Sequence, residues 1–246
     1  MRNRLAWCLG SLALMALMIG GGKVSLAANC SALPSKSQLQ AFLVAAPGTG
    51  GEAGGLFHGT LMWAAVVNRD GELCAFVTST ADPTQVWPGS QAIAKAKAFT
   101  ANAFSNDTLA LSTARLYTFT QPGHSLWSLG QSNPFSSSAM TTPSGKGGGG
   151  KNQVAGGMIF FGGGVPLYKN GKIIGGLGIS GDTSCTDHEI AKRVRNLAAL
   201  DPTGGSSVDD IKYSSVDGAG VFTHPLCLNT WRNNVPLGDE LPSAGY

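Results

Sequence analysis

Apolar side chains recur at helical spacing in three parts of the chain: 36–46, 91–104 and 187–200. Such a repeat places the apolar residues on one face of a helix. Ser90 stands directly before the second segment and favours the start of a helix there. Thr186 and Glu189 have the spacing of a capping box, so we expect the third helix to begin at Asp187.

Runs rich in β-branched and aromatic residues predict four strands, over 61–67, 73–78, 167–169 and 172–180. Asp70-Gly71 separates the first two runs, and Asn170-Gly171 separates the last two. These dipeptides accept the positive φ that a tight turn demands, so each pair of strands is predicted to form a hairpin. Further candidates are a short helix over 109–116 and a strand over 158–161.

Hairpins mixed with helices predict an α/β domain of the α+β type, in which an antiparallel sheet is flanked by helices. We expect one domain over residues 28–200, because the sequence shows no internal repeat. A Ser-, Gly- and Pro-rich stretch at about 133–153 is interpreted as a loop insertion. The polar residues 201–246 are expected to form a tail that packs on the domain.

Residues 1–27 have the pattern of a secretory signal peptide. Arg2 and Arg4 give a positive start, an apolar run follows over 5–19, and small residues then suit cleavage after Ala27 or Ala28. The run is short for a membrane span of about 20 residues. An uncleaved anchor is the alternative. We expect a periplasmic or secreted protein without a membrane span after signal removal.

The charge balance limits the partners of the exported chain. Charged residues are only 13% of the sequence, and glycine is 35 of 246 residues. Of the 17 basic residues, Arg2, Arg4 and Lys23 lie in the predicted signal, so 14 remain against 14 acidic residues. Without bulk positive charge, non-specific nucleic-acid binding is disfavoured. The absence of a G-X-Y repeat excludes collagen.

Four cysteines remain after the signal segment: Cys30, Cys74, Cys185 and Cys227. An even number in an exported chain predicts two disulfides. Three pairings are possible, and the sequence does not choose among them. We favour Cys185 with Cys227, which would pin the tail, and Cys30 with Cys74, which would tie down the N-terminus. Four buried free thiols are the alternative, and a zinc site is disfavoured because no C-x-x-C pair occurs.

Residues 176–181 match the pattern G-x-G-x-x-G. A dinucleotide site is disfavoured, because this strand leaves a hairpin and does not belong to a βαβ unit. The alternative is structural: glycines allow a helix or a ligand to approach a strand closely.

The histidines are not spaced as metal ligands. His58 follows a glycine-rich loop, and His124 lies in an aromatic-rich stretch with Tyr117, Phe119, Trp127 and Phe135. An imidazole beside aromatic and apolar groups is what a noncovalent haem pocket requires. Covalent attachment is excluded, because the motif C-x-x-C-H is absent. An ordinary loop histidine is the alternative at both positions, and we expect His188 and His224 to be solvated.

An ordered series of short motifs occupies the second half of the chain: Gly163-Gly164-Val165-Pro166-Leu167, Asn170-Gly171, Ile174-Gly175-Gly176-Leu177-Gly178-Ile179-Ser180-Gly181, and Asp187 with Ile190-Ala191. The series resembles the signature of the GlcG/HbpS-like haem-binding family. The helix over 94–101, with Lys97 and Thr100 at matching places, and the hairpin over 65–71 resemble it too. The resemblance covers about residues 36–200.

The resemblance implies a small α/β domain whose antiparallel sheet is flanked by helices and which often assembles into homo-oligomers. It implies a haem-binding, haem-degrading or iron-handling protein, or an accessory protein without a settled activity. We therefore expect noncovalent haem or a related tetrapyrrole as the ligand. The insertion and the cysteine-containing tail depart from the family pattern, as does Asn68, which stands where the family usually has an acid.

The expected ligand site is a slot between the helix over 91–104 and the glycine-rich strand. Missing side chains would leave room for a flat ligand at Gly163, Gly164, Gly176 and Gly178. Lys97 would meet a haem propionate, and His124 or Met140 would close over the iron. The matched motif positions Thr100, Pro166 and Asp187 complete the candidate set, with His58 as the second candidate ligand.

Two other functions stay open at this point. The first is a non-enzymatic accessory or sensor module that acts through oligomer surfaces, with Trp127 and Phe135 as subunit contacts. The second is an enzyme on a small organic acid, with Lys97 and Asp187 as polar site residues. The sequence supplies no complete catalytic set for it.

Overall fold

The computed structural model describes residues 30–136, 154 and 156–241. The predicted signal segment 1–27 lies outside the described residues. So do most of the expected insertion and Met140, and also the last five residues of the tail.

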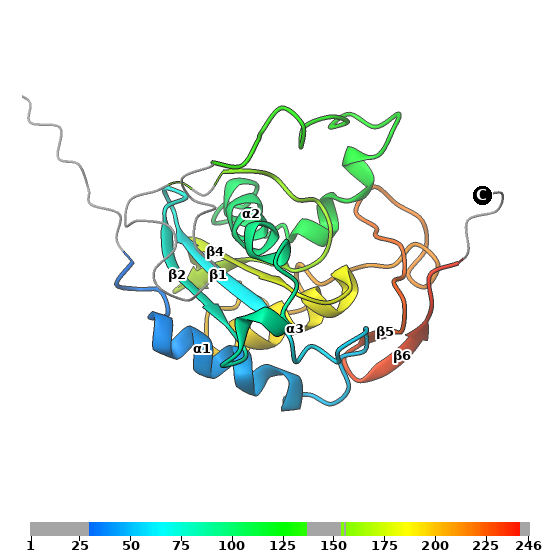
Figure 1. Ribbon diagram of the computed structural model, residues 1–246. Helices are drawn as coiled ribbons and strands as arrows, with labels where there is room; N and C mark the ends of the chain where they lie inside the picture. Colours follow the sequence, from blue (N-terminus) through cyan, green and yellow to red (C-terminus); the bar gives the residue numbers. More distant parts are fainter. Residues whose placement is uncertain (1–29, 137–153, 155, 242–246) are drawn as a thin grey trace, which may run out of the picture.

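Four antiparallel strands form the central sheet (Figure 1), in the order β2 (Leu73–Thr78), β1 (Trp63–Asn68), β4 (Lys172–Ser180) and β3 (Gly164–Lys169). The sheet thus consists of the two predicted hairpins laid side by side. Their turns have the positive φ expected from the sequence: 85° at Gly71, 52° at Asn170 and 73° at Gly171.

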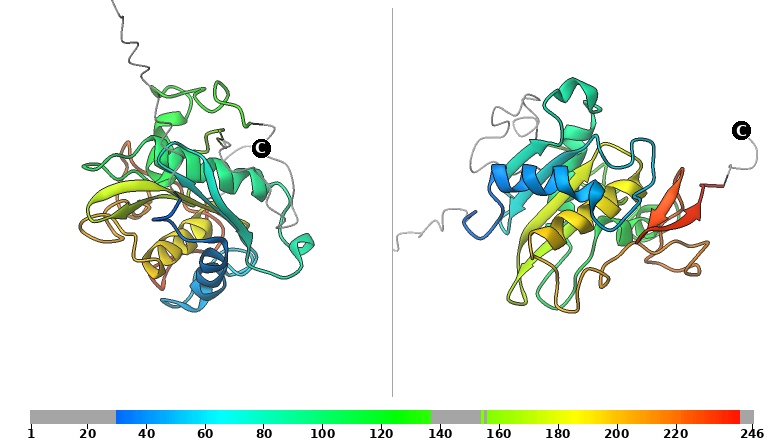
Figure 2. Two further views of the ribbon diagram at one scale, coloured as in Figure 1. Left: turned by 90° about the vertical axis from the view of Figure 1, so that its left-hand side faces the viewer. Right: turned by 90° about the horizontal axis from the view of Figure 1, so that it is seen from below.

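Helices cover both faces of this sheet (Figures 1 and 2). Helix α2 (Ser90–Ala103) lies on one face, and α1 (Lys36–Ala45) and α3 (Ser184–Leu197) lie on the other. Alternate residues of β1 therefore enter different cores. Ala64 and Val66 pack with α1 and α3, whereas Ala65 and Val67 pack with α2. The predicted α+β fold is confirmed.

Several predicted element boundaries are wrong. Helix α3 begins at Ser184, because the Thr183 side chain accepts a hydrogen bond from the backbone N–H of Thr186 and caps the helix three residues earlier than expected. It ends at Leu197. Helix α2 begins at Ser90, which is its first residue and not its cap.

Two weaker sequence patterns also differ from the structure. Residues 109–116 contain only a 3₁₀ turn, Thr113–Leu116, and residues 158–161 contain no strand. In the first segment, the four residues 109–112 precede the 3₁₀ turn without the backbone hydrogen bonds of a helix.

The tail after residue 200 packs along one flank of α3, and it ends in a small hairpin of β5 (Thr230–Arg232) and β6 (Val235–Gly238) (Figure 2). Arg195 of α3 is fully buried beneath it and pairs with Asp209 at 2.7 Å. The favoured cysteine pairing is confirmed, because Cys185 is bonded to Cys227 and Cys30 to Cys74.

Candidate functional site

Lys97 and Asp187 form an ion pair at the centre of the molecule. The Lys97 Nζ lies 2.7 Å from Asp187 Oδ2 and donates a second hydrogen bond to the carbonyl of Ile179 at 3.1 Å. Both side chains are buried. The pair joins α2 to the first turn of α3 across the edge of the sheet. The sequence predicts these two residues in one site, and the structure brings them into direct contact.

Burial acts on both members of this pair. It raises the pKa of Asp187 to about 6, against the opposing effect of Lys97. Burial lowers the pKa of Lys97, again against the attraction of its partner. The Asp187 carboxylate also accepts the backbone N–H of Asp182 at 2.9 Å. Because the polar atoms of the pair face each other and the backbone, neither side chain presents a charge to an external ligand.

The slot predicted beneath α2 is closed, which corrects the sequence interpretation. A Cβ atom on Gly178 would lie 2.0 Å from the carbonyl oxygen of Ala94, and one on Gly176 would lie 2.2 Å from that of Ala98. The glycines therefore allow the helix backbone to approach β4, which is the structural alternative for the G-x-G-x-x-G pattern. The helix itself fills the space that a flat ligand would need.

The remaining family-matched positions are also occupied by internal contacts. A Cβ atom at Gly163 would lie 2.7 Å from Lys97 Nζ, and one at Gly164 would lie 2.5 Å from the Thr113 side chain. The Thr100 hydroxyl donates to Ala96 and accepts the N–H of Ile159. The Pro166 carbonyl accepts a hydrogen bond from Arg195. These residues build the interface between α2, α3 and the sheet.

An open groove lies where the segment after α2 meets the C-terminal tail. Its volume is about 570 Å³, and its lining includes Tyr117, His124, Val221, His224 and Pro225. The His124 side chain is exposed and makes no hydrogen bond within the described part of the chain. The sequence predicts a ligand site at His124 and its aromatic surroundings. It did not predict that the tail supplies the opposite wall.

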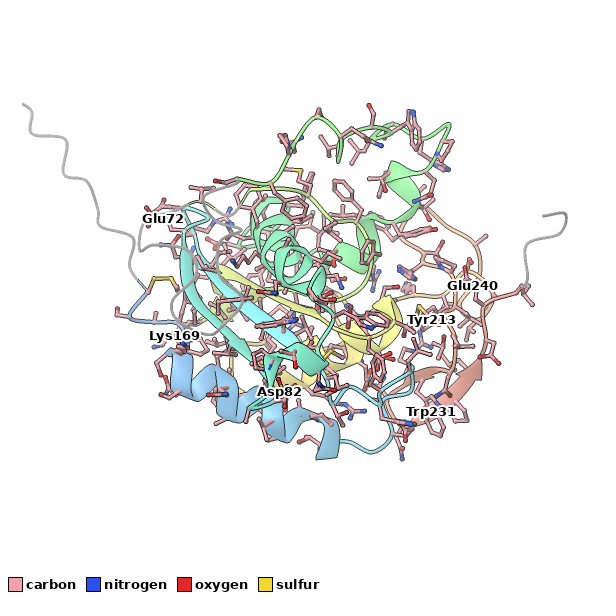
Figure 3. The ribbon with its side chains drawn as sticks, viewed as in Figure 1. Glu72, Asp82, Lys169, Tyr213, Trp231 and Glu240 are labelled. Atoms are coloured by element: carbon pink, nitrogen blue, oxygen red, sulfur yellow. A yellow bond between two sulfur atoms is a disulfide. The ribbon has the colours of Figure 1, made fainter. Side chains whose placement is uncertain are left out.

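His224 is buried at the base of this groove, and the expectation that it is solvated is wrong. Its ring lies 4.7 Å from the ring of Tyr117 and packs edge-on against Tyr213 at 6.4 Å. Figure 3 labels Tyr213 where α3 and the tail meet. The Nδ1 atom lies 2.6 Å from the Pro225 carbonyl, which can only accept a hydrogen bond. The proton is therefore on Nδ1, and Nε2 carries a lone pair.

Burial lowers the pKa of His224 to about 4, so the ring is neutral at physiological pH. His188 is also buried, which again corrects the sequence interpretation. Its Nε2 accepts the backbone N–H of Ile211 at 3.1 Å. Both histidines are covered because the tail packs over α3, and a local pattern carries no signal for such a contact.

His58 lies in a different part of the structure from the groove lining. Its backbone φ is 53°, and its Nδ1 lies 3.1 Å from Glu52 Oε1. The loop around it is held by Asp182, whose carboxylate accepts the backbone N–H groups of Leu56 and Phe57. The structure thus separates the two histidines that the sequence offered as candidate ligands.

The described residues contain no helix that combines the length and apolar character needed to cross a bilayer. A search of curated proteins finds no significant match. Several solved structures are similar over most of their own length. The PduOC–heme complex is 24% identical, covers 65% of this chain and 89% of its own, and has a TM-score of 0.46.

Two further structures show a similar degree of likeness. Protein ORFY from Klebsiella pneumoniae is 22% identical over 67% of this chain and 88% of its own, with a TM-score of 0.44. A double mutant of HbpS from Streptomyces reticuli is 17% identical over 79% of this chain and 98% of its own, with a TM-score of 0.45. The model of one family, described as haem degrading protein HbpS-like, matches residues 52–195, which span both hairpins, α2 and most of α3. The chain therefore belongs to the HbpS-like family.

Proposed function

We propose that this protein binds haem or a related tetrapyrrole without a covalent link and handles haem or iron outside the cytoplasm. Membership of the HbpS-like family, whose description is haem degrading, carries this proposal. The two disulfides support an oxidising compartment, and the N-terminal signal pattern supports export.

The groove between the segment after α2 and the tail fits such a ligand better than the closed space beneath α2. Its volume of about 570 Å³ is within the usual range of small-molecule pockets, about 300–1,000 Å³. Tyr117, Val221 and Pro225 give it apolar and aromatic walls, and the Ser214 and Thr118 side chains supply polar groups. A flat, largely apolar ring with polar edges matches this lining.

His124 is the residue that would hold the iron. Its imidazole lines the groove and makes no hydrogen bond among the residues that the structure describes, so a ring nitrogen is available. Bound haem would supply an iron centre that can bind small ligands and exchange electrons. The residues of the groove would bind the ring, orient it and shield one face from water.

A hemin titration of the purified mature protein tests the proposal. We expect a shifted Soret band that saturates at one equivalent. His124→Ala should change the band and weaken binding at least about tenfold, which corresponds to about 1.4 kcal/mol. His58→Ala is the matched control, because this exposed histidine pairs with Glu52, and it should leave both unchanged.

Two results would contradict the proposal. The first is an unchanged Soret band at hemin concentrations well above micromolar. The second is normal hemin binding by His124→Ala, which would remove His124 as the iron ligand and, if His58→Ala loses binding, transfer the site to His58. If the Soret absorbance is lost when reductant and oxygen are added, and neither catalase nor an iron chelator prevents this loss, the protein also degrades the haem that it binds.

A specific surface observation favours a second function, that of an accessory or sensor module acting through homo-oligomer surfaces. Trp127, which the sequence offers as a subunit contact, is 52% exposed, and an apolar patch built around such a residue would mark a contact between proteins. Size-exclusion chromatography with and without hemin separates the two functions. Assembly without hemin, together with an unchanged absorption spectrum, would favour the module.

An enzyme that uses Lys97 and Asp187 on a small organic acid has less support. Both side chains are buried against each other, so a substrate at these residues would first have to separate α2 from α3.

A further inference from the structure

A cluster of three metal-ligand side chains lies between the start of α3 and the tail. Cys185 Sγ, Cys227 Sγ and a ring nitrogen of His224 all lie within 4.8 Å of one another, and all three residues are buried. Cys185 belongs to the first turn of α3, whereas His224 and Cys227 belong to the tail. The two sulfurs form a disulfide in this structure. In the oxidised protein the two sulfurs are bonded to each other and cannot bind a metal, whereas reduction would make both available as ligands.

His224 is oriented as a metal-binding histidine. Its Nδ1–H donates to the Pro225 carbonyl at 2.6 Å, which fixes the ring and its tautomer. Metal-bound histidines are held in this way by a carbonyl or carboxylate on the other nitrogen. The Nε2 lone pair accepts the backbone N–H of Gly162 at 3.4 Å, a long hydrogen bond that a metal ion would replace, and it also lies 3.4 Å from Ser184 Oγ. The same Ser184 Oγ lies 3.2 Å from Cys227 Sγ, so imidazole and sulfur face one small volume.

The N-terminus of α3 favours a thiolate at Cys227. The backbone N–H of Cys185 donates to Cys227 Sγ at 3.1 Å. This N–H belongs to the first turn of a 14-residue helix, where backbone N–H groups have no acceptor within the helix itself. Donors in that position and the helix dipole stabilise negative charge, which promotes the ionised sulfur that binds metals.

We propose that reduction of the Cys185–Cys227 disulfide creates a binding site for Zn²⁺, made of two thiolates and the His224 imidazole. The Ser184 hydroxyl or a water molecule would complete four ligands. Two cysteines, one histidine and a fourth oxygen ligand match the preference of this cation for tetrahedral nitrogen and sulfur sites. Absence of a C-x-x-C pair in the sequence does not exclude the site, because the fold brings together residues that are 42 positions apart.

The chemistry balances with a dithiol reductant. Two electrons and two protons from the dithiol convert the disulfide into two thiols, and the dithiol ends as a disulfide. Binding of Zn²⁺ then releases the two thiol protons to solvent. Tetrahedral ligation at about 2.3 Å places two sulfurs about 3.8 Å apart. Once the bond is reduced, rotation about the cysteine side chains would bring the sulfurs to this separation.

Either state of this cluster would hold the tail on α3. The disulfide does so in the oxidised protein, and Zn²⁺ would do so in the reduced protein. His224 also lines the groove, but the proposed haem ligand, His124, is not a member of the cluster, so different variants test the two sites. Failure of hemin binding in His124→Ala and failure of Zn²⁺ binding are therefore separate results.

Zn²⁺ titration of the mature protein, oxidised and reduced with a water-soluble phosphine, tests the proposal. A chromogenic chelator competes for the metal, and Co²⁺ serves as a spectroscopic substitute. We expect one tight equivalent in the reduced protein only, with the absorption of tetrahedral thiolate-bound Co²⁺. Cys185→Ser/Cys227→Ser should lose this equivalent, while its reduced Cys30 and Cys74 remain as an internal control.

The histidine is tested by two variants with the same reduction protocol. His224→Ala should weaken Zn²⁺ binding at least about tenfold, in line with the loss of groups that orient or ligate a metal. His58→Ala should bind as the wild type does. Equal Zn²⁺ binding by the reduced wild type and the double serine variant would overturn the proposal, as would an unchanged affinity in His224→Ala.

Circular dichroism during the titration covers the case in which reduction unfolds the chain. Recovery of the folded spectrum on adding one equivalent of Zn²⁺ would support the site, because metal binding then drives folding. An unfolded spectrum that Zn²⁺ leaves unchanged would overturn it.

Discussion

A charged side chain in the protein interior is tolerated only when a partner of opposite charge lies beside it. Lys97 and Asp187 are buried with their charged atoms 2.7 Å apart, and the Lys97 ammonium also lies 4.8 Å from the centre of the Phe161 ring. Removal of one partner leaves a charge with little solvent around it. The pair is thus a condition for packing α2 and α3 against the same sheet edge, independent of any ligand.

Asp187→Asn tests this dependence. The amide keeps the size of the side chain but leaves the Lys97 charge without its counterion, so we expect a loss of about 3–5 kcal/mol in the free energy of unfolding. Urea denaturation followed by tryptophan fluorescence measures it. The double variant Lys97→Met/Asp187→Leu should recover much of the loss. A single variant as stable as the wild type would contradict the buried pair.

His224 gives a pH dependence of a defined sign. Its pKa is about 4 in the folded protein and about 6.5 in an unfolded chain. Between about pH 6.5 and pH 4, His224 is protonated in the unfolded chain but stays neutral in the folded protein. The free energy of unfolding therefore falls as the pH drops through this range. A shift of this size corresponds to about 3 kcal/mol.

Urea denaturation of the oxidised wild type and of His224→Phe at a series of pH values isolates this contribution. Phenylalanine keeps a ring beside Tyr117 but does not titrate. The difference in stability between the two proteins should change by about 3 kcal/mol between pH 7 and pH 4. A difference that is constant over this range would mean that the ring is accessible to protons in the folded state.

At the scale of elements, the contact between α2 and β4 depends on glycine. Gly178 lies opposite Ala65 of β1 in the sheet, and its missing side chain makes room for the α2 backbone at Ala94. The conformation of Gly178 itself does not require glycine, since its φ is not in the left-handed region. Close approach of the helix is therefore the reason for glycine at this position.

Gly178→Ala should force α2 away from the sheet, because the new methyl group would lie 2.0 Å from the Ala94 carbonyl. We expect a loss of about 3 kcal/mol or more, as for an overpacked core. Thermal unfolding measures the effect. Gly48→Ala is the control, because nothing lies within 4 Å of its added methyl group, and it should stay within about 0.5 kcal/mol of the wild type.

At the scale of the whole molecule, the tail is part of the structure and of the groove. It buries Arg195 and His188 of α3 together with its own His224, and it supplies one wall of the groove that contains His124. The Cys185–Cys227 disulfide is its covalent link to α3. Loosening of the tail should therefore affect both stability and ligand binding.

Cys185→Ser/Cys227→Ser tests this coupling in the oxidised protein. A crosslink that closes a loop of 42 residues contributes about 4 kcal/mol by the chain-entropy estimate, so we expect a loss of stability of that order. Hydrogen exchange should increase in residues 201–241 more than in the sheet, and hemin affinity should fall. Unchanged exchange in the tail would show that its polar contacts alone hold it.

Local chemistry along the chain was enough to predict the hairpins and helices. Asp70-Gly71 and Asn170-Gly171 specify tight turns because these residues accept positive φ, and the apolar spacing within each segment specifies its type. The even cysteine count likewise predicted two disulfides. Helix starts were less predictable, since Thr183 and Thr186 both offer a capping hydroxyl and only the backbone geometry decides between them.

Tertiary packing decided whether the glycine-rich strand faces a ligand or a helix, and which histidines are buried. The glycines of β4 indicate that another group approaches the strand closely, but a missing side chain does not specify whether that group is a ligand or a helix. Burial of His188 arises from a tail that lies far away in sequence, and the tail's own His224 is buried against Tyr117 and the start of α3. The spacing of apolar residues along the chain specifies which residues share a face of a helix or strand. Contacts between distant segments depend instead on how these elements pack against one another in the folded protein.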